Sequence, residues 1–148
     1  SARNIRTMPA TERVRIVHRF RSDPATVFAA LGEHENLGAA FGAKITRLRD
    51  GDTHRNGVGS ARTLKVGPLP GFVETVTTYE EPTLIEYEIT EGSPLVGHWG
   101  RQEFSPTGDG GTRLEYTIGF DAKVPGLAAI VAAGLKRNIR RGLPSIVE

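Results

Sequence analysis

The segment LAAIVAAGLKRNIRRGLP, residues 127–144, decides the fold. Its apolar residues recur at spacings of three and four, which is the period of a helix with one buried face. Its basic residues lie in the second half, where the negative end of the helix dipole favours cations. The pattern predicts a long amphipathic helix that breaks or kinks at Gly142-Leu143-Pro144, because proline removes a backbone donor.

Upstream of this helix, short segments of alternating polar and apolar residues are separated by turns rich in glycine, proline and aspartate. Such spacing favours antiparallel strands, because parallel pairs need longer crossover connections. The predicted strands cover residues 44–49, 57–66, 72–79, 84–90, 96–104 and 112–122. Together they predict an antiparallel meander that ends at the long helix.

The beginning of the chain adds one strand and two short helices. Residues 12–20 alternate in polarity and predict a strand. Asp23 and Pro24 then suit the N-cap and first position of a helix. A second short helix is predicted over 35–41, and we expect residues 1–11 to form a flexible arm before a single domain spanning 12–148.

Composition narrows the class of protein. The chain has 148 residues, 38% hydrophobic and 24% charged, which fits one globular domain. It has no cysteine, so disulfides and thiolate chemistry are excluded. The longest uncharged run, residues 124–135, is too short to span a bilayer, and no secretory leader is evident, so we expect a cytoplasmic protein without stable membrane insertion.

The net charge of +2 is unevenly distributed along the chain. Residues 1–21 carry +5 and residues 126–148 carry +3, while residues 22–125 carry −6. No aromatic interleaving or nucleic-acid motif accompanies the basic ends, so no nucleic-acid partner is expected.

The economical architecture for these elements is an α+β fold. A curved antiparallel sheet of about seven strands wraps its apolar face around the long C-terminal helix, with two short helices after the first strand. One helix cannot fill the concave face of a large sheet, so a cavity between them is expected.

The element order and several short motifs resemble a known family. The motifs are Val58-Gly59-Ser60-Ala61-Arg62, Ser93-Pro94-Leu95-Val96 and Gly110-Gly111-Thr112-Arg113-Leu114. Over roughly residues 12–142 the chain resembles the START-like (helix-grip) superfamily, and within it the polyketide cyclase/dehydrase and lipid-transport family. That resemblance implies a small hydrophobic or aromatic ligand in the cavity, and the superfamily includes both carriers and aromatase/cyclases.

The alternation of residues along each strand predicts which polar side chains face the helix. The C-terminal helix adds Ile130 and Leu135 to the expected site, and the loop after the second predicted strand of the meander adds Leu69. Arg62 is placed with Val58 and Leu64, whereas Trp99 is expected on the outer face. The predicted ligand-binding residues are His18, Arg62, Leu69, Glu74, Tyr87, His98, Gln102, Tyr116, Ile130 and Leu135.

Each of these candidates has a structural alternative. Arg62 and Glu74 form either an ion pair between neighbouring strands or a charged anchor, in which Arg62 meets a ligand carboxylate or Glu74 relays a proton. His18 and His98 are either core residues or acid–base groups, and the two tyrosines are either core aromatics or ligand contacts. Leu69 is either the tip of a lid or part of an ordinary turn.

No cofactor or metal site is expected from the sequence. The four histidines, His18, His34, His54 and His98, lack ligand spacing, and His34 with its neighbouring glutamates is expected to be an exposed cluster. Three functions remain open: a carrier of a small apolar ligand, which we favour, a cyclase/dehydratase-type enzyme without metal that acts by acid–base chemistry, and an interaction module that uses the basic helix end. A homodimer is left open, and no catalytic residue is assigned.

Overall fold

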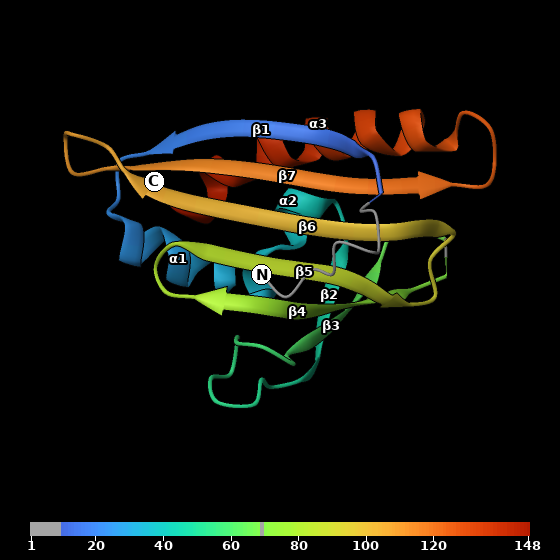
Figure 1. The fold of residues 1–148 in the computed structure, drawn as a ribbon, viewed down its shortest axis with the longest axis horizontal. Coiled ribbons are helices and arrows are strands. Elements are labelled where there is room, and N and C mark those ends of the chain that lie inside the picture. The colour runs from blue at the N-terminus through green and yellow to red at the C-terminus, as the bar shows by residue number, and fades with distance from the viewer. Residues whose placement is uncertain (1–9, 69) are drawn as a thin grey trace.

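One curved antiparallel sheet carries three α-helices on one of its faces (Figure 1). The computed structural model describes residues 10–68 and 70–148. In chain order the elements are β1 (Glu12–Phe20), α1 (Pro24–Gly32), the 3-10 helix η1 (His34–Asn36), α2 (Gly38–Phe41), β2 (Lys44–Arg49), β3 (Ala61–Lys65), β4 (Phe72–Glu80), β5 (Leu84–Glu91), β6 (Leu95–Pro106), β7 (Thr112–Ala122) and α3 (Leu127–Ile146).

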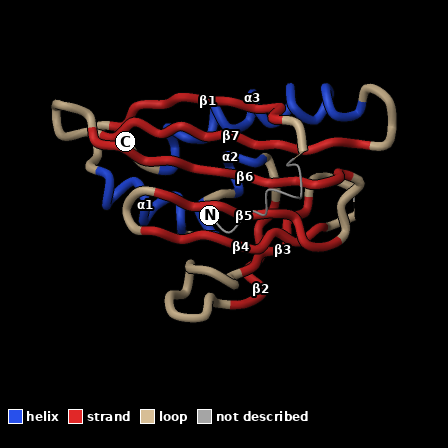
Figure 2. Tube along the Cα trace, in the orientation of Figure 1, coloured by secondary structure: helices blue, strands red, loops and turns tan. Residues whose placement is uncertain are grey.

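The sheet has seven strands in the order β1-β7-β6-β5-β4-β3-β2. Strands β2 to β7 follow one another as antiparallel neighbours, and β1 returns to pair with β7, where Ile16 lies opposite Tyr116. Helix α3 lies against β1, β7 and α2, as Figure 2 shows from the same side as Figure 1. The predicted helix-grip fold class is confirmed.

The core fills the space between the inner face of the sheet and the helices. Alternate residues of β1 and β7, such as Val14 and Leu114, are fully buried, and Ile139 and Leu143 of α3 are fully buried against them. Burying each of these aliphatic side chains contributes about 1.5–3 kcal/mol. The apolar residues that alternate along the strands and those that recur at the helical period in α3 therefore form one core.

Helix α3 continues through the predicted break. It runs to Ile146 with Pro144 inside its last turn, so the break expected at Gly142-Leu143-Pro144 is wrong. A Cβ atom on Gly142 would lie 2.5 Å from Ala40 Cα, so this glycine lets α3 pack closely on α2. Proline has no N–H for the carbonyl of Arg140, so its position near the end of α3 removes one hydrogen bond of the helix without ending it.

Two predicted boundaries also differ from the structure. Strand β3 begins at Ala61 because residues 57–60 form a turn, in which the Ser60 amide donates to the Gly57 carbonyl over 3.0 Å. Val58 is therefore 45% exposed and does not share the buried face of Arg62. The helix predicted over residues 35–41 is divided at Leu37 into η1 and α2.

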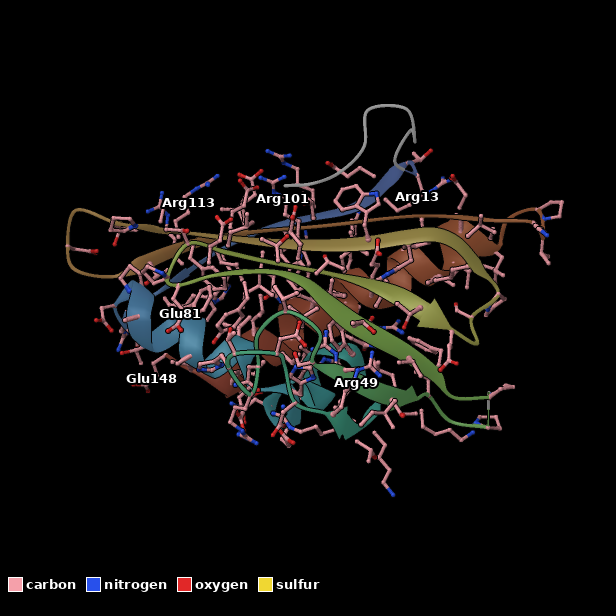
Figure 3. The ribbon with its side chains drawn as sticks, turned by 60° about the horizontal axis from the view of Figure 1, so that its bottom comes forward. Arg13, Arg49, Glu81, Arg101, Arg113 and Glu148 are labelled. Atoms are coloured by element: carbon pink, nitrogen blue, oxygen red, sulfur yellow. The ribbon has the colours of Figure 1, made fainter. Side chains whose placement is uncertain are left out.

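The outer face of the sheet is polar. Arg13, Arg101 and Arg113 project from it on the side away from the helices (Figure 3). Trp99 lies across Gly119 on this face and donates from Nε1 to the Ala10 carbonyl over 3.0 Å, as parity predicted. Within the described residues, no helix is long and apolar enough to cross a membrane.

Candidate functional site

Six of the ten predicted residues form one buried cluster on the inner face of the sheet. They come from five adjacent strands: Arg62 from β3, Glu74 from β4, Tyr87 from β5, His98 and Gln102 from β6, and Tyr116 from β7. Each is at most 8% exposed. Regular strand alternation points their side chains to the same face, so the sheet itself assembles the cluster.

Arg62 and Glu74 lie directly opposite each other on β3 and β4. Arg62 donates from Nε and Nη2 to the same oxygen, Glu74 Oε1, over 3.0 and 2.8 Å. Their side chains are 4% and 5% exposed. The guanidinium carbon also lies 4.9 Å from the centre of the Tyr87 ring and 5.8 Å from that of Phe41, so two aromatic faces enclose the cation.

His98 is held in one orientation by the backbone of β5. Its Nδ1 accepts a hydrogen bond from the Ile89 amide over 3.0 Å. The neutral ring therefore carries its proton on Nε2, which lies 3.9 Å from Glu74 Oε2. Burial lowers the pKa of His98 below 6.5, so the ring is a neutral donor at pH 7.

Two tyrosines complete the cluster through their hydroxyl groups. Tyr87 and Tyr116 are hydrogen-bonded to each other at their hydroxyls, and burial raises the pKa of both. A Cβ atom on Gly100 would lie 2.2 Å from the Tyr87 ring, so Gly100 provides the space in which this ring lies. Gln102 is paired with Tyr116 across β6 and β7 and is 1% exposed.

Three of the other four predicted residues, His18, Ile130 and Leu135, do not join this cluster. His18 is half-buried on β1, with its ring edge-on to Phe20, and burial lowers its pKa. Leu135 is half-buried against the core. Ile130 is 72% exposed, so its predicted inward position is wrong, because the helix turns Val131 and Leu135 to the core instead. Leu69 lies outside the described residues.

Two residues near the cluster were not among the predicted site residues. Phe41 ends α2 and contacts Arg62 and Tyr87 through its ring, but no periodic signal marks so short a helix. His34 is fully buried rather than exposed, because its Nε2 donates over 2.9 Å to Ser60, whose hydroxyl donates to the Gly57 carbonyl. Ser60 lies in the turn before β3, so strand parity gives no sequence signal for His34's partner.

The charge environment keeps His34 neutral. Burial and the nearby Arg62 lower the pKa of His34 to about 3. Among the residues that the structure describes, no group of three His, Asp or Glu side chains is placed to hold a metal ion. The chemistry available in the cluster is therefore that of one ion pair, one neutral imidazole, one amide and two phenols.

This architecture is that of a START-like domain: a curved sheet packs its inner face, with the polar cluster, against the long helix α3. The family model for polyketide cyclase / dehydrase and lipid transport matches residues 11–148. The chain belongs to this family.

Solved structures from several bacteria share the fold. A START superfamily protein from Mycobacterium smegmatis is 16% identical, with a TM-score of 0.74 over 90% of this chain and 95% of the other. An aromatase/cyclase from Streptomyces is also 16% identical, with a TM-score of 0.71 over 90% and 92%. A Thermus thermophilus protein is 19% identical, with a TM-score of 0.70 over 92% and 94%. No curated protein sequence matches the chain significantly.

Proposed function

We propose that this protein binds or carries a small hydrophobic or aromatic ligand between the inner face of the sheet and α3. The observation that supports the proposal is the polar cluster of six side chains on the inner face of the sheet, next to the apolar core. Burying polar groups costs free energy, and a core needs none of them for packing. Ligand sites, by contrast, are apolar enclosures in which a few polar groups fix orientation.

The family supports the same assignment. Its description combines polyketide cyclases, dehydrases and lipid transport, all of which handle molecules with a large apolar or aromatic part. Leu135 of α3 and His18 of β1 would line the apolar side of the site, and Leu69 would lie near its opening, as proposed from the sequence. The aromatic pair Tyr87 and Phe41, already in contact with Arg62, offers flat surfaces for a ring system.

A neutral fluorescent probe tests the proposal. Nile red should bind with a stoichiometry of about one per chain, and Tyr116→Ala should change its affinity by widening the interior. Leu48→Ala, at a residue that is 50% exposed on β2, is the matched control and should bind as wild type does. If no neutral apolar probe binds the folded protein, this function is wrong.

A cyclase/dehydratase-type enzyme is the second candidate. It is supported by His98, whose Nε2 proton faces Glu74 on the same surface as the tyrosine pair, an arrangement suited to acid–base chemistry. The similar Streptomyces structure is that of an aromatase/cyclase. Turnover of a linear poly-β-keto thioester that is abolished in His98→Ala, while Nile red binding persists, would establish this function. Binding of the thioester without turnover would leave the carrier.

Location and assembly stay predictions. We propose a cytoplasmic protein, which cell fractionation would test, and light scattering during gel filtration would decide between a monomer and a homodimer. The alternative of an interaction module rests on the basic residues of α3, and it would require a partner that Arg137→Glu and Arg140→Glu release.

A further inference from the structure

The buried cluster is electrically balanced before any ligand arrives. The guanidinium of Arg62 and the carboxylate of Glu74 compensate each other at 2.8 Å. His98 is neutral, and both tyrosines keep their protons because burial disfavours the phenolate. The nearby His34 is neutral as well. Among the described residues, the cluster therefore holds no uncompensated charge that could balance a charged ligand.

The cluster nevertheless has unused hydrogen-bonding atoms. Arg62 directs both of its bonds to Glu74 Oε1, and within the described residues no hydrogen bond is made by Arg62 Nη1, Glu74 Oε2 or His98 Nε2. In the described part of the chain, two other side-chain atoms are fully enclosed without a hydrogen-bond partner, His34 Nδ1 and Arg101 Nε. Of the three unused atoms of the cluster, Arg62 Nη1 and His98 Nε2 are donors and Glu74 Oε2 is an acceptor.

We propose that the polar group of the ligand is an uncharged hydroxyl, as in a phenol, enol or alcohol, and that the site discriminates against carboxylates. A hydroxyl both donates and accepts, so it can donate to Glu74 Oε2 while it accepts from Arg62 Nη1 or His98 Nε2. A carboxylate accepts only, would face the carboxylate of Glu74, and would bring an uncompensated charge into a buried site. This inference rests on the proposed binding function and narrows its ligand class; it also argues against Arg62 as a carboxylate anchor.

Three aromatic probes of one ring system test the inference at pH 7: naphthalene, naphthol and naphthoate. Wild-type protein should bind naphthol with a dissociation constant at least about tenfold lower than that of naphthoate, with naphthalene as the uncharged reference. In Glu74→Gln the site gains an unpaired guanidinium, so the order should reverse in favour of naphthoate. Glu88→Gln changes the net charge equally at an exposed position of β5 and should keep the wild-type order.

The possible outcomes distinguish failure of the hydroxyl assignment from failure of the proposed binding function. Equal or tighter binding of naphthoate by wild-type protein overturns the hydroxyl assignment and leaves the carrier function intact. Failure of all three probes to bind overturns the carrier function itself. The wild-type comparison needs no variant, so it tests the hydroxyl assignment even if Glu74→Gln does not fold. If that variant folds and still prefers naphthol, the charge-balance argument is contradicted.

Discussion

The ion pair between Arg62 and Glu74 gives the sharpest test at the scale of single residues. Both side chains are about 95% buried, so removing one charge leaves the other without its partner. Glu74→Gln should lower the free energy of unfolding by about 3–5 kcal/mol. Glu80→Gln, the same change at an exposed residue of the same strand, should cost far less. Urea denaturation of both variants measures the difference, and equal small losses would show that the pair contributes little.

Gly100 sets the position of a site residue without touching a ligand. A methyl group there would overlap the Tyr87 ring, which is enclosed and hydrogen-bonded to Tyr116 and so cannot swing freely aside. Gly100→Ala should cost about 1–3 kcal/mol of stability and weaken Nile red binding. Gly108→Ala, where the added carbon has open space, is the control and should bind the probe normally. An unaltered affinity in Gly100→Ala would separate Tyr87 from the site.

Strand parity could predict the polar cluster because it depends only on alternation within regular strands. Arg62, Glu74 and Tyr87 lie in segments where every second residue is apolar, so their facing follows from the sequence. The same logic could not place His34, because its burial depends on a hydrogen bond to a serine in a distant turn. The prediction for Ile130 is wrong because α3 has a short, alanine-rich apolar stripe. Such a stripe does not determine how the helix is rotated about its axis, and the packing partners decide which residues face the core.

Helix packing explains why α3 continues through Gly142 and Pro144, although its sequence predicts an end there. Gly142 and Pro144 both suggest a helix end, but Gly142 lies against the backbone of Ala39 and Ala40, and the buried Leu143 fixes the last turns. The contact between α2 and α3 thus overrides local propensity. No pattern within α3 alone contains the information that a second helix approaches at this glycine.

Two alanine substitutions within α3 should have opposite effects. Gly142→Ala would place a carbon 2.5 Å from Ala40 Cα, so α2 and α3 must separate, at a cost of about 1–3 kcal/mol or more. Gly134→Ala meets nothing within 4 Å and should stabilise the helix by roughly 0.5–1 kcal/mol, because alanine is the better helix former. Thermal unfolding monitored by circular dichroism compares the two. A stabilising Gly142→Ala would mean that α2 yields at no cost.

For the whole molecule, the order of strands and helices was predictable, and so were the bounds of β1, β2 and β7, whereas the start of β3 and the end of α3 were not. Turn residues separate the strands in the sequence, and the connections are too short for parallel pairing, so one antiparallel sheet follows. The antiparallel pairing of β1 with β7 completes the sheet next to α3. The true start of β3 depends instead on contacts that loop residues 57–60 make with β4.

Buried neutral histidines should make the stability of the whole molecule depend on pH. The folded-state pKa of His34 is lowered to about 3 by burial and nearby arginines, and burial also lowers the pKa of His98 and His18. Below pH 6.5 the unfolded chain therefore binds protons that the folded chain does not, so the free energy of unfolding falls as the pH is lowered from about 6.5 towards 3.

The variant His34→Gln isolates the largest of these contributions. Glutamine keeps a donor for Ser60 but does not titrate, so it should remove up to about 4–5 kcal/mol of the loss between pH 6.5 and 3, which is the free energy of a shift of this size. Leu48→Gln, an exposed and non-titrating change, should keep the wild-type slope. Urea unfolding at a series of pH values measures both slopes. If His34→Gln loses stability with falling pH as steeply as wild type, His34 is not the buried neutral group that the packing against Ser60 implies.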